Sequence, residues 1–330
     1  MDVNTMTERL GTWARAHAGP RAAVTQVATL PGHSGISFGF ELTGDQARDR
    51  LVIRIPPAGV SRTGIADVVR QVPLLGFMER SGVPVPRVRW WGEDERWFGV
   101  PYLIVDYVPG ATLGDVFSET SEVADAEPLF VQAVEALVRI HAADWRVGLA
   151  GWDAPRRLGG EVERYLPLLR RSPERDWVTL GEALATALGG SVPPEPVPAV
   201  VHNDFYSNNW MFEDGRLTGV LDWEGTFIGA PLLDLGWLCM MYDPPSWSPA
   251  HRARIHWSPP VELIAELYGA ASGSRPAALD WYRAFAGYRL ASLTAYYLHL
   301  HRRGRRPDAA WENLAESVPH MLERATALTT

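Results

Sequence analysis

Lysine is absent from this chain of 330 residues, so all 31 of its basic residues are arginine. The glycine-rich phosphate loop that ends in Gly-Lys-Ser/Thr is excluded, and so is the lysine Schiff base of pyridoxal enzymes, because each needs a lysine side chain. Any phosphate bound by this protein must be held by arginine, by backbone amides or by a metal ion.

Cysteine and long apolar runs are also scarce. Cys239 is the single cysteine, so no disulfide can form within the chain, and its apolar neighbours favour a small buried side chain over a nucleophile. No apolar run approaches the roughly 20 residues that a membrane-spanning helix needs. The first residues are polar and acidic, so we expect no secretory signal, a cytoplasmic location and no membrane partner.

The remaining composition is that of an ordinary globular protein, with 46% hydrophobic and 21% charged residues. A chain of this length favours two lobes over one. The net charge of −8 argues against nucleic acid as a partner. Most of the negative charge follows residue 108, which indicates either a solvated surface or a weak preference for a neutral or cationic ligand. The sequence fits a monomer or a homodimer equally.

Two patterns divide the chain near Val108-Pro109-Gly110. Before this point short β-type runs alternate with turn signals, and one helix is expected over roughly residues 64–80. After it, apolar residues recur at helical spacing, as in 127–145 and 278–301. We therefore expect an α+β fold. Residues 1–108 would form a small lobe with an antiparallel sheet and one helix, and residues 109–330 a larger, mainly helical lobe.

A set of polar residues late in the chain has a spacing suited to one chemistry. His202, Asp204 and Asn209 follow an apolar run in the pattern H-x-D-x-x-x-x-N. Asp214-Gly215 is a strong two-residue hairpin signal, and Asp222 follows the second strand of that hairpin. The hairpin is expected to return the chain so that Asp222 lies beside Asn209.

This pattern is typical of phosphoryl transfer from a metal-bound nucleotide. Asp204 could accept the proton of a hydroxyl as that hydroxyl attacks phosphorus. The side-chain oxygens of Asn209 and Asp222 are ligands that Mg²⁺ prefers, with room for water and phosphate oxygens. Each residue alone would most often be a cap or a turn residue. The joint spacing favours catalysis.

The same residues carry a resemblance to a known family. The H-x-D-x-x-x-x-N segment with the later Asp222-Trp223, together with Gly32-His33-Ser34-Gly35, resembles the aminoglycoside phosphotransferase-like family of small-molecule kinases, which also includes choline kinases. The resemblance implies a protein-kinase-like fold of two lobes. It also implies Mg²⁺ as cofactor, ATP or GTP as phosphoryl donor, and a small hydroxyl-bearing acceptor.

The resemblance also implies roles for individual residues. Ser34 and Gly35 would belong to the loop that covers the nucleotide. The backbone of Asp106 and Val108 would hold adenine at the hinge between the lobes.

Two nucleotide-binding positions depart from the family pattern. Arg54 stands where the family usually has the lysine that grips the donor phosphates, and Gln71 stands where its acidic partner is usual. Arginine is permanently charged and binds phosphate in a forked geometry, so function can survive; the alternative is a solvent-facing strand arginine. We expect Arg54 to pair with Gln71, or with Asp67 one helical turn earlier. Pro73 should start or kink the helix.

Support of the catalytic loop is expected from two further residues. The resemblance implies that Asp234 anchors the loop from a helix, and His202 is expected to hold it from within. Ala230 replaces the usual aspartate, which would remove a helix N-cap without affecting the chemistry. Asn203 replaces the usual glycine, and Asn accepts turn conformations better than most residues.

The acceptor is less constrained. An antibiotic-like natural product, such as a macrolide, an aminoglycoside or another glycoside, is the first expectation, with antibiotic resistance as its role. A hydroxyacyl-CoA-type metabolite is the alternative. Trp247 and Trp257 lie in the proline-rich stretch 243–260 and could form a loop over the acceptor. The candidate acceptor-binding residues are Glu224, Tyr206, Trp247 and Trp257.

Two alternatives stay open. A cationic aminoglycoside would need carboxylates, for which Glu224, Asp234 and Asp243 are the candidates. A function of a different class is a pseudokinase, which binds nucleotide without transferring phosphate. The joint presence of a base and two metal-binding side chains favours an enzyme over such a binding module.

Overall fold

The computed structural model describes residues 1–30, 36–44, 48–56, 66–116 and 126–330. The predicted nucleotide-loop residues Ser34 and Gly35 lie outside this part. Two compact units make up the chain. Met1–Ala111 and Trp210–Gly225 form the first, here named the sheet unit; Thr112–Asn209 and Thr226–Thr330 form the second, the helical unit.

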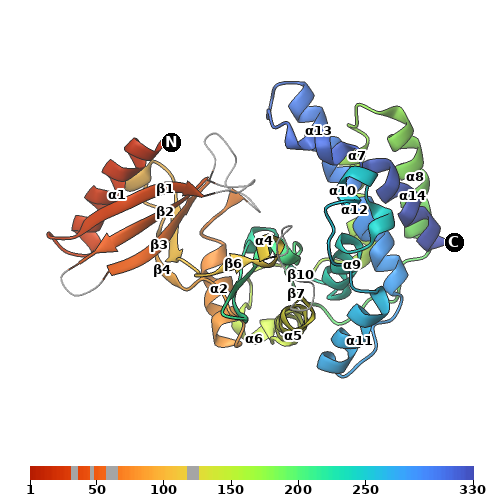
Figure 1. The fold of residues 1–330 in the computed structure, drawn as a ribbon, viewed down its shortest axis with the longest axis horizontal. Coiled ribbons are helices and arrows are strands. Elements are labelled where there is room, and N and C mark those ends of the chain that lie inside the picture. The colour runs from red at the N-terminus through yellow and green to blue at the C-terminus, as the bar shows by residue number, and fades with distance from the viewer. Residues whose placement is uncertain (31–35, 45–47, 57–65, 117–125) are drawn as a thin grey trace. The chain divides into compact units, whose positions relative to one another are not determined.

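In the described part of the sheet unit, five strands form one antiparallel sheet in the order β1-β2-β3-β5-β4 (Figure 1). Alternate residues of β3 are buried, as the two-residue period of a strand requires, and in β2 the buried apolar residues are Phe38, Phe40 and Leu42. These side chains form a core with one face of helix α1. The strands are β1 (Ala23–Leu30), β2 (Ile36–Thr43), β3 (Arg48–Ile55), β4 (Val88–Gly92) and β5 (Tyr102–Asp106).

Helix α1 (Val3–His17) covers the sheet next to β1. The carboxylate of Asp2 accepts a hydrogen bond from the amide of Thr5 at 2.9 Å and so caps the helix. Trp13 is fully buried and donates from Nε1 to the hydroxyl of Tyr102 at 3.0 Å. The sequence predicted one helix in this region, so α1 and the short α3 (Glu95–Phe98) are additions.

Helix α2 (Gln71–Arg80) is the predicted helix, but it begins later than expected. Pro73 lies in its first turn, where the missing N–H costs no helical hydrogen bond. Asp67 lies in the turn before the helix, where its Oδ1 accepts from the backbone amides two and three residues on, at 3.1 and 3.3 Å. The turn formed by Asp67 accounts for the late start.

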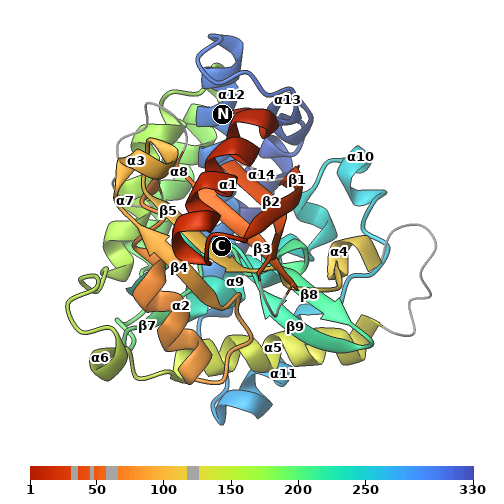
Figure 2. The same cartoon turned by 90° about the vertical axis from the view of Figure 1, so that its left-hand side faces the viewer.

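A hairpin completes the sheet unit (Figure 2). Strands β8 (Trp210–Glu213) and β9 (Arg216–Val220) pair so that Trp210 faces Val220. Asp214 and Gly215 both have positive φ, 50° and 73°, as the predicted hairpin turn requires. The 3₁₀ turn η4 (Trp223–Gly225) follows. By contacts this hairpin groups with residues 1–111, and the lobe boundary placed after residue 108 stays a prediction.

In the helical unit, α12 (Leu279–Arg302) is the central helix and has 14 buried residues. Gly236 of α9 lets that helix approach α12 closely, because a Cβ at this position would lie 2.5 Å from the backbone of Tyr282. The helices packed on α12 are α7 (Leu158–Leu169), α8 (Arg175–Gly190), α9 (Leu232–Met241), α13 (Ala310–Ala315) and α14 (Val318–Thr329) (Figure 1).

The other elements of this unit are short or peripheral, apart from α5 and α11. Strands β7 (Ala199–Val201) and β10 (Phe227–Gly229) pair antiparallel on either side of the catalytic segment in the sequence. Strand β6 (Ala111–Thr112) is where the chain first enters the unit. The helices and turns are α4 (Leu113–Val116), α5 (Ala126–Ala142), α6 (Trp145–Gly148), η3 (Ser207–Asn209), η5 (Pro244–Ser246), α10 (Pro249–Arg252) and α11 (Val261–Ser272).

The predicted α+β architecture is confirmed: a small antiparallel sheet comes first in the chain and a mainly helical region follows. None of the helices in the described ranges combines the length and the apolar character that crossing a bilayer would take.

Candidate active site

The H-x-D-x-x-x-x-N segment forms a loop in the helical unit between β7 and η3. Asn209 donates from Nδ2 to both the backbone carbonyl and the carboxylate Oδ2 of Asp204, at 2.8 and 3.0 Å. The amide of Asp204 donates to Nδ1 of His202 at 3.3 Å. The NH₂ end of the Asn209 amide is thus engaged by Asp204, and the oxygen is the atom of this side chain that could serve as a metal ligand.

The carboxylate of Asp234, near the start of α9, binds the backbone of this loop. Its two carboxylate oxygens accept the backbone N–H groups of His202 and Asn203, each at 2.7 Å. Asp234 is fully buried, and His141 of α5 lies 3.1 Å from its Oδ2. The other ring nitrogen of His141 lies 2.8 Å from the hydroxyl of Tyr268, whose pKa is raised by burial. The sequence did not predict His141 or Tyr268.

Arg289 of α12 also binds the backbone of this loop. Its Nη2 donates to the backbone carbonyl of Asn203 at 2.5 Å, and its guanidinium lies over the ring of Trp237 at 4.3 Å from the centroid. Arg289 is only 8% exposed. Asn203 has a φ of 73°, a conformation that Asn accepts more readily than most residues. An arginine among the apolar residues 284–291 of α12 was the available signal for this contact.

In the sheet unit, Arg54 of β3 makes a three-way contact. Its Nη1 donates to Oε1 of Gln71 at 3.3 Å, which decides between the two predicted partners. Its Nη2 donates to Oε2 of Glu224 at 2.9 Å and to Oδ1 of Asp222 at 3.3 Å. The sequence did not predict the contacts with Asp222 and Glu224. Arg54 is therefore an internal arginine rather than a solvent-facing one.

Asp222 has the features of a ligand residue. Its φ of 64° is unusual for a residue other than glycine, and such backbone strain gathers at functional sites. Its side chain is 34% exposed, and one of its oxygens contacts Arg54. Val220, two residues earlier, pairs with Trp210, the residue after Asn209. Asn209 and Asp222 thus flank the paired ends of the hairpin along the chain.

Asn209 lies in the helical unit and Asp222 in the sheet unit. The side chain of each carries a hard oxygen, the kind of ligand that Mg²⁺ accepts together with water and phosphate oxygens. No group of three or more His, Cys, Asp or Glu side chains suited to a metal occurs among the described residues.

The predicted hinge residues lie at and just after the end of β5. The backbone amide of Asp106 donates to the carbonyl of Arg87 at 2.9 Å, and its carboxylate accepts from Arg89 at 2.7 Å. The N–H of Asp106 is therefore engaged within the sheet unit. Val108 follows two residues on and packs against Gly219, where a Cβ would lie 2.8 Å from its Cγ1.

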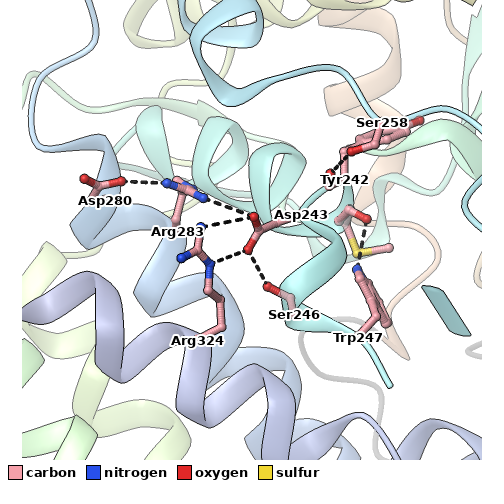
Figure 3. Close-up of polar contacts among 9 residues, drawn as sticks. Tyr242, Asp243, Ser246, Trp247, Ser258, Asp280, Arg283 and Arg324 are labelled. Carbon is pink, nitrogen blue, oxygen red and sulfur yellow. Dashed lines mark hydrogen bonds and ion pairs between the residues drawn. The ribbon is translucent and has the colours of Figure 1, made fainter. Parts of the chain in front are cut away.

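A cavity of about 210 Å³ opens in the helical unit beside the catalytic loop. Two of the candidate acceptor residues, Tyr206 and Trp257, line it. Trp247 does not: it is 6% exposed, packs in the core and donates from Nε1 to the carbonyl of Met241 at 3.1 Å (Figure 3). Glu224 belongs to the sheet unit and pairs with Arg54.

The carboxylates considered for a cationic acceptor are all engaged. Figure 3 shows Asp243 accepting hydrogen bonds from Arg283 at 3.3 Å, from Arg324 at 2.8 and 3.2 Å, and from Ser246 at 2.9 Å. Asp234 is buried beneath the catalytic loop, and Glu224 is bound to Arg54. The internal contacts of these carboxylates argue against a cationic acceptor held by them.

Cys239 matches its prediction as a buried side chain. Burial raises the pKa of its thiol to about 12, which keeps the sulfur protonated and unreactive near neutral pH.

The geometry can be compared with known proteins. Acyl-CoA dehydrogenase family member 10 from Mus musculus is 26% identical over 296 residues; the match covers 85% of this chain but only 27% of that protein. A provisionally assigned aminoglycoside phosphotransferase from Ralstonia eutropha JMP134 superposes with a TM-score of 0.80 at 22% identity, covering 98% of each chain.

A thermostable mutant of aminoglycoside phosphotransferase APH(4)-Ia, solved with ADP and hygromycin B, gives a TM-score of 0.63 at 16% identity, covering 97% of each chain. These two structures share the fold of this chain. The family model named phosphotransferase enzyme family matches residues 29–267, which confirms the resemblance drawn from the sequence. The chain belongs to the phosphotransferase enzyme family.

Proposed function

We propose that this protein is a small-molecule O-phosphotransferase, which moves the γ-phosphoryl group of ATP or GTP to a hydroxyl of its acceptor. The observation that carries the proposal is the loop in which Asp204 is held by Asn209 while Asp234 and Arg289 fix the preceding backbone. A carboxylate so constrained is suited to orient a hydroxyl and accept its proton.

Each group of this chain then has one task. Asp204 aligns the acceptor hydroxyl with phosphorus and takes its proton as the new P–O bond forms. The hydrogen bond from Nδ2 of Asn209 to Oδ2 orients this carboxylate. Asn209 and Asp222 would hold Mg²⁺, which neutralises charge on the transferring phosphoryl group when it is bound.

Arg54 is proposed to bind the donor phosphates. It would exchange its contacts with Asp222 and Glu224 for phosphate oxygens, for which its forked donors are suited. Gln71 beside it has a buried Nε2 with no hydrogen-bond partner in the described part of the chain. A phosphate oxygen would supply that acceptor. The ADP bound to the structural neighbour supports a nucleotide donor, and Ser34, Gly35, Asp106 and Val108 remain the proposed nucleotide contacts.

The acceptor is proposed to be an antibiotic-like natural product or a related metabolite. The hygromycin B bound to the neighbour supports the former. The likeness to a protein named for acyl-CoA dehydrogenases supports the alternative, a hydroxyacyl-CoA-type metabolite, although this chain spans about 27% of that protein. Tyr206 and Trp257 are proposed to contact the acceptor because they line the cavity beside the loop.

Acceptor-dependent release of ADP from Mg-ATP, measured over a panel of hydroxylated compounds, tests the proposal. Asp204→Asn should abolish release while leaving nucleotide binding unchanged. Asp214→Asn, an exposed carboxylate in the hairpin turn, is the matched control and should behave as the wild type. Nucleotide binding without acceptor-dependent release on any compound would show a pseudokinase instead.

A further inference from the structure

Two segments of the chain form the walls of the cavity beside the loop of Asp204. One wall is the loop itself, through Tyr206, Ser207 and Asn208, which follow Asp204 directly along the chain. Tyr242, which follows the last residue of α9, also lines the cavity. The facing wall is the segment from Arg254 to Trp257. Both walls belong to the helical unit.

One end of the cavity is apolar and well braced. Phe130, Tyr242 and Trp257 pack edge to face in a mutual trio, with ring centroids 5.5, 5.1 and 6.0 Å apart. Ser258 also hydrogen-bonds to the carbonyl of Tyr242, which ties the segment after Trp257 to the end of α9 (Figure 3). These rings form a firm surface for an apolar group.

The volume of the cavity limits what it holds. About 210 Å³ is below the roughly 300–1,000 Å³ of pockets that enclose a whole drug-sized ligand. A compact alcohol fits such a space, and so does one arm of a larger molecule.

The cavity lining carries one permanently charged side chain, the guanidinium of Arg254. Arg254 and His256 line it, and none of the described lining residues is acidic. Arg254 forms no ion pair with any carboxylate in the described part of the chain, and both side chains are exposed. Asp243, the acid next to Tyr242, is 7% exposed and turned toward Arg283 and Arg324 (Figure 3). The cavity therefore offers positive charge without a compensating acid.

We propose that the acceptor alcohol carries an oxyanion, a carboxylate or a phosphate, that Arg254 binds while the apolar body of the acceptor lies against Tyr242 and Trp257. An exposed arginine recognises such a group by charge-assisted hydrogen bonds. His256 adds a further donor beside it. The inference rests on the proposed function, because it takes the cavity beside Asp204 as the acceptor site.

Direct binding tests it without relying on catalysis. The probes are straight-chain alcohols that share one apolar chain and differ only at the far end, which carries a carboxylate, a phosphate, a primary amide or an ammonium group. Calorimetry on the full chain should show binding of one or both anionic probes, and the better of the two identifies the oxyanion. Preference for the amide or ammonium probe, or binding of none, would overturn the inference.

Variants locate the contact. Arg254→Met should weaken binding of the anionic probe about tenfold, the loss expected for a hydrogen bond to a charged group at an exposed site, and Arg254→Lys should restore part of it. Arg252→Met, two residues earlier and outside the cavity lining, should change nothing. If Arg254→Met lowered the affinity for the anionic and the amide probes equally, Arg254 would not distinguish a charged ligand from a neutral one.

Kinetics separate this inference from the proposed function. Acceptor-dependent ADP release with a KM that rises only for anionic acceptors in Arg254→Met supports both. Anionic probes that bind through Arg254 while no alcohol stimulates ADP release confirm the contact between Arg254 and an oxyanion and count against the phosphotransferase activity. Release with neutral or cationic alcohols alone supports the activity and overturns the inference.

Discussion

Arg289 donates a hydrogen bond from its Nη2 to the backbone carbonyl of Asn203, 86 residues away in the sequence, at a distance of 2.5 Å. The residue that follows Asn203 is Asp204, the proposed base. Since the guanidinium is buried and lies over Trp237, it acts as a fixed brace for the backbone rather than as a mobile surface group.

Replacing this brace should slow the reaction. Arg289→Met leaves the Asn203 carbonyl without its donor, at a cost of about 1–3 kcal/mol, and should lower kcat about tenfold or more while KM for ATP changes little. Arg289→Lys keeps the charge but not the planar fork, so it should recover only part of the rate. Equal rates for Met and wild type in steady-state assays, with the fold intact by circular dichroism, would contradict the positioning role.

Asp222 and Glu224 both contact Arg54, yet only Asp222 is proposed to bind Mg²⁺. Asp222→Asn should therefore lower kcat by about 100-fold or more and raise the Mg²⁺ concentration needed for half-maximal rate. Glu224→Gln removes the other carboxylate from Arg54 and should leave that Mg²⁺ requirement unchanged. Calorimetric titration of nucleotide with and without Mg²⁺ provides a check independent of turnover, and a shift of equal size in both variants would count against Asp222 as the ligand.

The ion pairs of Asp243 should matter for stability rather than for acceptor choice. Asp243→Asn leaves Arg283, which is 7% exposed, without its buried partner, so the free energy of unfolding should fall by about 3 kcal/mol. Asp280→Asn removes the other partner of Arg283, a carboxylate that is 66% exposed, and should cost under about 1 kcal/mol. Urea denaturation of both variants measures the difference, and similar losses would disagree with this assignment.

His251 links two parts of the helical unit and should make stability depend on pH. Its Nδ1 lies 3.0 Å from the hydroxyls of both Ser248 and Ser317, and burial, followed by the charge of Arg254, lowers its pKa below the ordinary 6.5. The unfolded chain then binds the proton more readily than the folded one. The contribution to stability is complete above pH 6.5 and is lost as the pH falls through the folded pKa.

His251→Gln keeps a polar side chain that does not titrate. The difference in unfolding free energy between wild type and this variant should therefore shrink as the pH is lowered below 6.5. Thermal or urea denaturation on both sides of this pH measures it. A difference that stays constant with pH would show that His251 does not titrate differently in the folded state.

Short-range patterns predicted more of this protein than long-range ones. Asp204 and Asn209 could be assigned to one loop because only four residues lie between them, and Asp214-Gly215 predicted the hairpin through its turn chemistry. His141, which is 93 residues from Asp234, was not predicted, because a histidine on an amphipathic helix carries no mark of its partner.

The sequence did not predict features that depend on packing between distant parts of the chain. Trp247 and Trp257 lie ten residues apart in one proline-rich stretch, and the same prediction was made for both, a loop over the acceptor. In the structure Trp247 lies in the core, where its indole N–H donates to the carbonyl of Met241, whereas Trp257 lines the cavity. Helix α1 was missed although Met6, Leu10 and Trp13 have helical spacing, because nothing local shows the sheet that they cover.

The close approach at Gly236 packs the two helices that support the loop of Asp204 directly against each other. Asp234 lies two residues before it on α9, and Arg289 lies on α12, the helix whose backbone Gly236 nearly touches. The geometry around Asp204 is thus set before any nucleotide arrives. Amide hydrogens of residues 202–204 should exchange slowly in the ligand-free protein, and a methyl group at position 236 should loosen them without altering a single side chain of the loop.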